Sequence, residues 1–266
     1  MTDHGNMFGT IQFYKAAKAR GIKPIIGSEI YVAEDRFDRN DRTRYHLILL
    51  AENDVGYHNL MKIVSEGYVN GFYYKPRVDK DFLRAHSEGI ICLSACLAGE
   101  VARRAVDSDY ETAKETALIY RDIFGQDNFY LEIQDHDIRE ERKVQKVFAQ
   151  ISEETGIGLV ATNDVHYTKQ EDAEAHDILL CIQTGKTLQE EDRMRFPSNN
   201  FYLKSHEEMD DLFSRYPEAI ENTARIAERC NVEIAFHQLH LPHFDIPTDE
   251  SNIEYFERLV MDGIDE

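Results

Sequence analysis

Short apolar runs rich in β-branched residues alternate with stretches of helical periodicity along much of the chain. The apolar runs lie at Pro24–Val32, Tyr45–Leu50, Gly89–Ser94, Phe129–Ile133 and Gly158–Ala161. Between them, apolar residues recur at the spacing of a helix, as they do from Ala113 to Phe124. Repeated strand–helix units of this kind predict a parallel sheet with helices outside it, either open or closed as a barrel.

The pattern changes after Lys169, where the strand–helix repeat ends. Helical stretches at 170–182 and 217–230 dominate, and polar loops join them. The segment Gln238–Thr248 holds two prolines and is typical of an extended connector, and an amphipathic helix is expected from about Ile253. We therefore expect a barrel domain over residues 1–168, a helical extension over 169–236, and a connector with the start of the next helical segment over 237–266.

Acidic residues outnumber basic ones, with 50 Asp and Glu against 30 Lys and Arg, so the net charge is −20 with histidine neutral. This charge opposes unassisted binding to nucleic acid, because non-specific binding to phosphates relies on lysine and arginine releasing counterions. The sequence has neither a basic arm nor an arginine-rich run. An autonomous nucleic-acid-binding module is therefore not expected, and metal ions or another part of a larger protein would have to supply positive charge.

Hydropathy, the N-terminal residues and the cysteine content indicate in which cellular compartment the protein is expected. No run of about 18 apolar residues is present, as a membrane-spanning helix would require. Met1 is not followed by the basic and apolar stretches of a secretory signal. Four cysteines are too few for a disulfide scaffold in a chain of 266 residues. We expect a soluble, reduced, cytoplasmic protein that does not bind membranes.

Side chains that can bind metals recur at the ends of the expected strands. They are His4, Glu29, His46, Cys96, Asp164 and His166. Chemistry in such folds collects at one rim of the sheet, so we expect these side chains to converge there. Residues two apart in an extended segment project to the same side, so Asp164 and His166 can bind one ion or two neighbouring ions.

The donor types indicate which ions and which chemistry suit such a site. Mixed nitrogen, oxygen and sulfur donors favour zinc, iron or manganese over calcium. Two or three of these ions at roughly 3.5–4 Å from one another can bind both the attacking and the leaving oxygen of a phosphate ester and activate a water molecule. The set of residues therefore favours phosphoester hydrolysis.

Structural interpretations compete with this one. A single histidine at a strand end, such as His46 taken alone, is more often a hydrogen-bonded structural residue than a ligand. Glu132, at the end of the fourth apolar run, could be a salt-bridge partner as easily as a ligand. Most of the other histidines, among them His136 and His240, are expected at the surface. Cys92, Cys181 and Cys230 lie in apolar segments and are expected to be buried thiols.

Six strings in a consistent order carry a family resemblance. They are TDHGNMFG (Thr2–Gly9), GSEIYVA (Gly27–Ala33), HLILLAEN (His46–Asn53), LSACLAGE (Leu93–Glu100), ATNDVHY (Ala161–Tyr167) and LLCIQTGKTL (Leu179–Leu188). Over essentially its whole length the chain resembles the polymerase-and-histidinol-phosphatase (PHP) domain of bacterial replicative DNA polymerase III alpha subunits. The resemblance implies an α/β fold, a distorted (β/α)7 TIM-like barrel followed by a mainly helical segment that leads to the polymerase palm.

The resemblance also implies a cluster of two or three divalent metal ions, zinc or manganese or iron. Its implied ligands are His4, Glu29, His46, Cys96, Asp164 and His166, and we expect catalytic roles for Asp164, His166 and His4. Glu132 is not in the family's ligand set. The family's opening His-x-His motif and a further acidic ligand would lie upstream of Met1. We therefore expect a fragment that lacks its first strand and carries an incomplete ligand set, with the polymerase catalytic residues beyond Glu266.

Three functional hypotheses follow. The first is part of a replicative DNA polymerase whose PHP domain removes 3′ nucleotides as a proofreading 3′–5′ exonuclease, with DNA and replisome subunits such as the sliding clamp as partners. The second is a non-catalytic PHP scaffold that docks a separate proofreading exonuclease. The third is a free-standing PHP phosphatase of the histidinol-phosphatase type. The string at Leu179–Leu188 and the helical continuation past residue 170 speak against the third.

Overall fold

The structure, a computed structural model, describes residues 1–107, 109–239 and 241–265. The chain divides into two compact units, Met1–Glu233 and Ile234–Glu266. His240, expected at the surface, lies outside the described residues. Residues 169–233 belong to the same compact unit as residues 1–168, and the boundary predicted after residue 168 stays a prediction.

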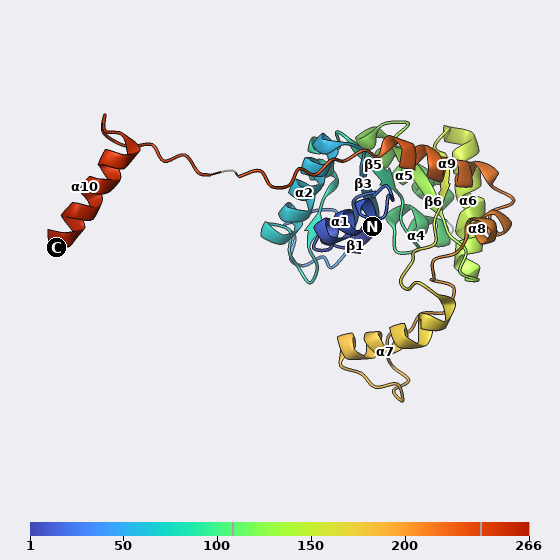
Figure 1. Cartoon of the computed structure of the whole chain (residues 1–266). Helices are drawn as coiled ribbons and strands as arrows, with labels where there is room; N and C mark the ends of the chain where they lie inside the picture. Colours follow the sequence, from blue (N-terminus) through green and yellow to red (C-terminus); the bar gives the residue numbers. More distant parts are fainter. Residues whose placement is uncertain (108, 240, 266) are drawn as a thin grey trace. The chain divides into compact units, whose positions relative to one another are not determined.

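The first unit alternates strands and helices along most of its length (Figure 1). Its strands are β1 (Thr2–His4), β2 (Gly27–Val32), β3 (Tyr45–Ala51), β4 (Arg77–Val78), β5 (Ile90–Leu93), β6 (Phe129–Ile133) and β7 (Gly158–Ala161). Its α-helices are α1 (Thr10–Lys18), α2 (Asp54–Val69), α3 (Lys80–Ala85), α4 (Glu100–Val106), α5 (Tyr110–Phe124), α6 (Arg139–Thr155), α7 (Ala173–Thr184), α8 (His206–Leu212) and α9 (Pro217–Arg229), and the 3₁₀-helix η1 (Gln170–Asp172) precedes α7. The five predicted apolar runs all contain strands. The residues ahead of the first helix, where no complete strand was expected, form the short strand β1.

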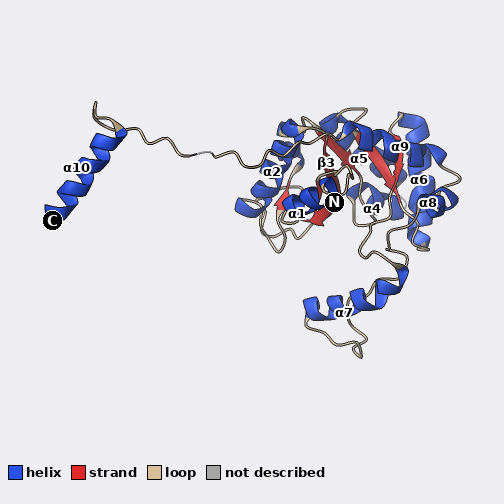
Figure 2. Cartoon of the chain, viewed as in Figure 1, coloured by secondary structure: helices blue, strands red, loops and turns tan. Residues whose placement is uncertain are grey.

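The strands form one sheet with the order β1-β2-β3-β5-β6-β7. One edge of β2 pairs with β1 along Gly27–Glu29 and with β4 along Tyr31–Val32. Helices lie around the strands (Figure 2). The arrangement confirms an α/β fold like the predicted TIM-like barrel. Among the described residues no strand pairing joins β7 to β1 or β4, so hydrogen bonds do not close the barrel.

The prediction that the sheet is parallel is wrong for β3. This strand runs antiparallel to both of its neighbours, β2 and β5, whereas the pairs β1–β2, β2–β4, β5–β6 and β6–β7 are parallel. A parallel connection needs a crossover, usually a helix, and residues 33–44 between β2 and β3 contain none. Apolar periodicity reports which residues are buried but carries no information on strand direction.

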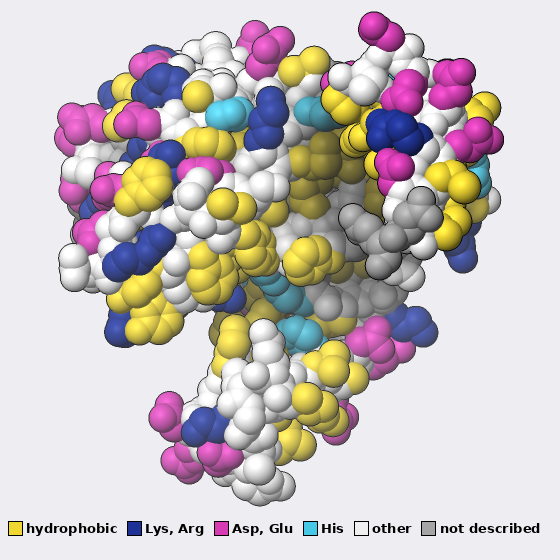
Figure 3. All heavy atoms as spheres, turned by 90° about the vertical axis from the view of Figure 1, so that its left-hand side faces the viewer, with side chains coloured by type: hydrophobic (Ala, Val, Ile, Leu, Met, Phe, Trp, Pro, Cys, Tyr) yellow, Lys and Arg dark blue, Asp and Glu magenta, His cyan; other side chains and the backbone are white. Residues whose placement is uncertain are grey.

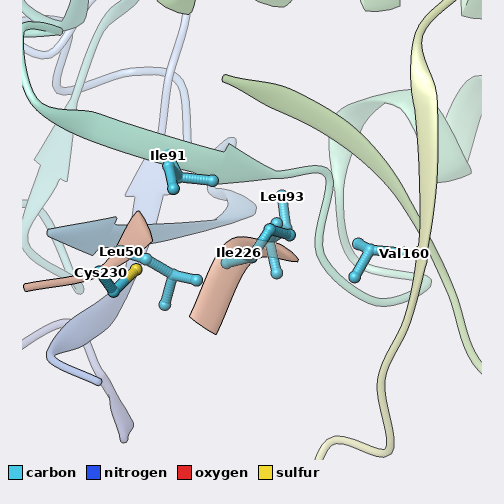
Figure 4. Packing of buried hydrophobic residues seen from close by; sticks show 6 residues of the cluster. All are labelled: Leu50, Ile91, Leu93, Val160, Ile226 and Cys230. Carbon is cyan, nitrogen blue, oxygen red and sulfur yellow. The ribbon is translucent and has the colours of Figure 1, made fainter. Parts of the chain in front are cut away.

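Helix α9 packs against the sheet and completes a core beside it. Ile226 and Cys230, at the end of this helix, form a cluster with Leu50, Ile91, Leu93 and Val160 of β3, β5 and β7 (Figure 4). All six side chains are buried. The helix predicted at 217–230 is therefore confirmed as α9. Its apolar face packs against strands that also contribute residues to the site described below.

The second unit contains α10 (Asn252–Asp265), the amphipathic helix predicted from about Ile253. Among the described residues, no helix combines the length and the apolar character needed to cross a membrane.

Candidate metal centre

One cavity of the first unit, about 530 Å³ in volume, brings the candidate ligands together. All six predicted ligands line it: His4, Glu29, His46, Cys96, Asp164 and His166. Segments separated by up to 162 positions in the sequence thus contribute to a single site.

Strand pairing explains how His4, Glu29 and His46 meet. His4 is the last residue of β1 and stands opposite Glu29 in the parallel register with β2. His46 lies at the start of β3 and pairs with Tyr31, near the end of β2, because β3 is antiparallel to β2. If β3 were parallel to β2, His46 would lie beside the start of β2, at the other end of the strands. The reversal of β3, which the sequence did not reveal, is therefore what brings His46 to the rim.

Short contacts connect five of the six side chains in series. Oε1 of Glu29 lies 2.6 Å from Nδ1 of His4 and 3.1 Å from Nδ1 of His46. The Sγ of Cys96 lies 3.7 Å from the same nitrogen of His46. On the other side, Nε2 of His4 lies 3.4 Å from Nε2 of His166.

The loop after β7 orients His166. Nδ1 of His166 donates a hydrogen bond of 2.7 Å to the carbonyl oxygen of Asp164. This bond fixes the proton on Nδ1 and leaves the lone pair of Nε2 free to bind a ligand. In the same way, Nδ1 of His4 donates to the Glu29 carboxylate. The second ring nitrogens, Nε2 of His4 and Nε2 of His166, contact each other in the cavity.

Two residues in the site loops have unusual backbone conformations. Ala95, which precedes Cys96, has φ 64°, and Asp164 has φ 41°. Non-glycine residues rarely adopt the left-handed region, and such strain concentrates at functional sites. Both conformations occur where a loop turns a candidate ligand toward the cavity.

Burial and hydrogen bonding shift the pKa values of the acidic groups. Burial raises the pKa of Glu29, but hydrogen bonds from His4 and His46 outweigh it and lower that pKa to about 2. The hydrogen bond to Glu29 raises the pKa of His4. Burial raises the pKa of the Cys96 thiol and, with the nearby charge of Glu29, that of Asp164. The cavity thus holds an ionised carboxylate between two imidazoles, beside a thiol and a second carboxyl whose pKa values burial raises.

The donor set fits a metal cation. One donor atom each from Glu29, His46 and Cys96 lies within 4.8 Å of the others. Ligands at about 2.1 Å from a tetrahedral zinc ion are roughly 3.4 Å apart, which is close to the 3.1 Å and 3.7 Å separations seen here. A cation would also satisfy the buried carboxylate and favour the thiolate over the thiol.

His136, expected at the surface, is instead completely buried behind the site. Its Nδ1 lies 2.7 Å from Oε1 of Glu141, and its Nε2 donates to the carbonyl oxygen of Asn163 at 2.9 Å. Its ring stacks on Phe201 with 3.9 Å between centroids. His136 therefore holds the residue that precedes Asp164. No sequence signal distinguished it, because its partners lie on other segments.

Glu132 is buried beneath the site but does not line the cavity. Its carboxyl accepts hydrogen bonds from the backbone N of Ala95, from Gln134 and from the hydroxyl of Thr162. Burial raises the pKa of Glu132 to about 7. This residue ties the Cys96 loop to the end of β7 rather than acting as a ligand.

Comparison with known proteins places the chain in a family. The PHP domain family matches residues 1–136. DNA polymerase III subunit alpha of Treponema pallidum is 50% identical over 97% of this chain, that of Borreliella burgdorferi 47% over 99%, and that of Thermus aquaticus 41% over 99%. The chain spans only 22–24% of the length of these relatives. Matches of this extent show that the chain belongs to the PHP domain family and resembles the corresponding part of DNA polymerase III alpha subunits.

Proposed function

We propose that this chain provides a DNA polymerase III alpha subunit with a metal-dependent phosphoester-hydrolysing site that removes nucleotides from DNA 3′ ends. The observation that carries the proposal is the convergence of six chelating side chains on one cavity. DNA synthesis by the larger protein, replisome partners such as the sliding clamp, and a cytoplasmic location belong to the same proposal. They rest on the similarity to polymerase relatives of which this chain spans about a fifth.

The six residues divide into two groups around the cavity. Glu29, His46 and Cys96 would hold one ion, and His4, Asp164 and His166 would hold a second. When bound, divalent zinc, manganese or iron supplies charge stabilisation to the oxygens of the reacting phosphate and acidifies water.

The side chains themselves orient the site. Glu29 hydrogen-bonds His4 and His46 through one oxygen, so the two rings keep a fixed relation to each other. The carbonyl of Asp164 fixes the tautomer of His166. Nε2 of His4 and Nε2 of His166 are thereby held beside each other in the cavity, where a phosphate would lie.

An aromatic wall borders this space. The Phe196 ring lies 4.7 Å from the His166 ring and 4.6 Å from that of Phe201, and both phenylalanines line the cavity. Such rings exclude water from one side of the reacting group and provide a face on which a terminal base can stack.

The test uses a 5′-labelled oligonucleotide and purified protein supplied with zinc or manganese. Asp164→Asn should abolish shortening from the 3′ end, because an amide is a poor metal ligand. The matched control Asp192→Asn changes an exposed carboxylate that lines no part of this cavity, and it should shorten the oligonucleotide as the unchanged protein does. Equal shortening by the Asp164→Asn variant would refute the assignment.

A non-catalytic scaffold is the second candidate, and one observation favours it. The Glu29 carboxylate already accepts hydrogen bonds from two imidazoles, so the buried charge is satisfied without an ion. Elemental analysis separates the two candidates. A catalytic site should carry zinc, manganese or iron at a stoichiometry of about one or more per chain, and a scaffold should carry none.

A further inference from the structure

A second cavity, about 450 Å³ in volume, adjoins the candidate metal centre. The two cavities share His46, Ala98 and Arg103 in their linings. Four arginines line the second cavity, namely Arg42, Arg44, Arg103 and Arg104. We call it the arginine groove.

The backbone explains why these arginines lie together. Arg42 and Arg44 precede β3, while Arg103 and Arg104 belong to α4. The backbone N of His46 donates to the carbonyl of Ala98, so the start of β3 is fixed to the loop that leads into α4. The sequence shows no arginine-rich run because two separate segments supply the four residues.

A buried arginine holds the segment that leads into Arg42 and Arg44 in place. The guanidinium of Arg77, completely buried, donates to the backbone carbonyls of Asp38 and Asp41 at 2.7 Å and 2.6 Å. The side chain of Asp41 is itself engaged, since it accepts hydrogen bonds from the backbone and hydroxyl of Thr43. Arg42 and Arg44 therefore extend from a segment whose backbone is fixed by hydrogen bonds.

Positive charge exceeds negative charge in the described part of the groove. Among the described residues none of the four arginines forms an ion pair, and the buried Nε of Arg104 makes no hydrogen bond. Asp107 supplies the single carboxylate among the described lining residues, so four positive charges face one negative charge. Acidic side chains are otherwise spread widely, as the face drawn in Figure 3 shows.

An exposed aromatic residue lies beside the groove. Nη2 of Arg42 donates to the hydroxyl of Tyr74 at 2.9 Å, and the Arg42 guanidinium lies 4.5 Å from the centre of that ring. Tyr74 is 60% exposed and contacts the ring of Tyr73 at 4.7 Å. Guanidinium groups bind phosphates, and exposed aromatic rings stack on unpaired bases.

We propose that the arginine groove binds the phosphates of a single-stranded nucleic acid whose terminal nucleotide enters the metal cavity. This inference rests on the proposed function and adds the path that the strand takes to the site. Arg44 and Arg103 contact successive phosphates, and Tyr74 offers a stacking face for a base further along the strand. A cavity of about 530 Å³ has the size of a small-molecule pocket and accepts one nucleotide rather than a duplex end.

The experiment measures binding of a fluorescein-labelled oligothymidylate by anisotropy, in the presence of a chelator, so that neither metal nor hydrolysis contributes. The groove variant is Arg44→Gln with Arg103→Gln, both exposed residues. The matched control is Arg20→Gln with Arg215→Gln, which removes the same charge from exposed residues outside the groove. Thermal unfolding of each variant verifies that it is folded.

We expect the groove variant to bind at least about tenfold more weakly than the control, since each arginine makes a charge-assisted contact. The slope of log affinity against log salt concentration should become less steep by about 1.4, at about 0.7 per lost phosphate contact on a single strand. Equal binding by the two variants, or an unchanged slope, would overturn the inference. Because the assay contains no metal, failure of the hydrolytic function would not affect this result, and loss of binding would not affect metal content.

Discussion

His4 and Glu29 occupy paired positions on the parallel strands β1 and β2, and Nδ1 of His4 lies 2.6 Å from Oε1 of Glu29. The register of two short strands, rather than a flexible loop, therefore sets the spacing between an imidazole and a carboxylate of the candidate metal centre. Glu29 is only 3% exposed, so its charge depends on the groups around it. Variants of this pair, a buried carboxylate and a half-exposed imidazole, test the site directly.

Replacing Glu29 with Gln should weaken metal binding and stability together. The amide cannot supply the negative charge that both imidazoles, or a cation, require. We expect zinc affinity, measured against a competing chelator, to fall by at least about tenfold. In metal-free protein, urea unfolding should show a loss of about 1–3 kcal/mol in the free energy of unfolding. Glu34→Gln, at a carboxylate that is largely exposed, is the control and should change neither quantity.

Glu132 should make stability depend on pH in the direction opposite to that of an ordinary paired carboxylate. Burial raises its pKa in the folded protein to about 7 from a usual value of 4.5. The folded state therefore keeps a proton that the unfolded state loses. The resulting stabilisation is complete below pH 4.5 and is lost as the pH rises through about 7, at a slope of up to about 1.4 kcal/mol per pH unit.

The variant Glu132→Gln isolates this contribution. The glutamine amide does not ionise. Its oxygen can accept from the backbone N of Ala95, and its NH2 group can donate to the hydroxyl of Thr162 if that hydroxyl rotates. Urea unfolding at pH 5, 7 and 8.5 should show the variant gaining stability relative to the unchanged protein as the pH rises. Parallel pH profiles for the two proteins would show that Glu132 does not titrate in this range.

The sequence predicted the strand positions and the side chains that gather at the cavity well, but not how the strands run. The apolar runs located β2, β3, β5, β6 and β7, and residue chemistry with the family resemblance selected six side chains that the structure places on one cavity. The direction of β3 depends on pairing between segments, which local periodicity does not encode. The burial of His136 and the clustering of Arg44 with Arg103 likewise arise from tertiary contacts.

A substitution of His136 tests whether this buried histidine positions the loop that carries Asp164. His136→Leu would remove the imidazole that bonds Oε1 of the buried Glu141 carboxylate and the hydrogen bond to the carbonyl of Asn163, and would leave only the backbone N of residue 136 on Oε2 of Glu141 among the described partners. We expect a loss of about 3 kcal/mol in the free energy of unfolding, as for other broken buried pairs. Zinc affinity should also fall by about 10–100-fold, although His136 does not line the cavity.

The control for this variant is His58→Leu, at an exposed histidine of α2 whose ring hydrogen-bonds the backbone carbonyl of Asp54 in the same helix. It should leave zinc affinity unchanged. If the His136→Leu protein is folded at the assay temperature and binds zinc as tightly as the control, His136 has a purely structural role and does not position the Asp164 loop.

Ile226 of α9 tests whether the helices after residue 169 fold together with the strands. Its buried side chain packs against strands β3, β5 and β7 through the cluster in Figure 4. Ile226→Ala should therefore lower the free energy of unfolding by about 2–5 kcal/mol, because it leaves a cavity in a shared core. The loss should shift a single urea transition, seen equally by circular dichroism and by tyrosine fluorescence, whereas Thr223→Ala on the exposed face of the same helix should shift it little. Two separate transitions, of which only one responds to Ile226→Ala, would instead show that residues 169–233 unfold independently of the sheet.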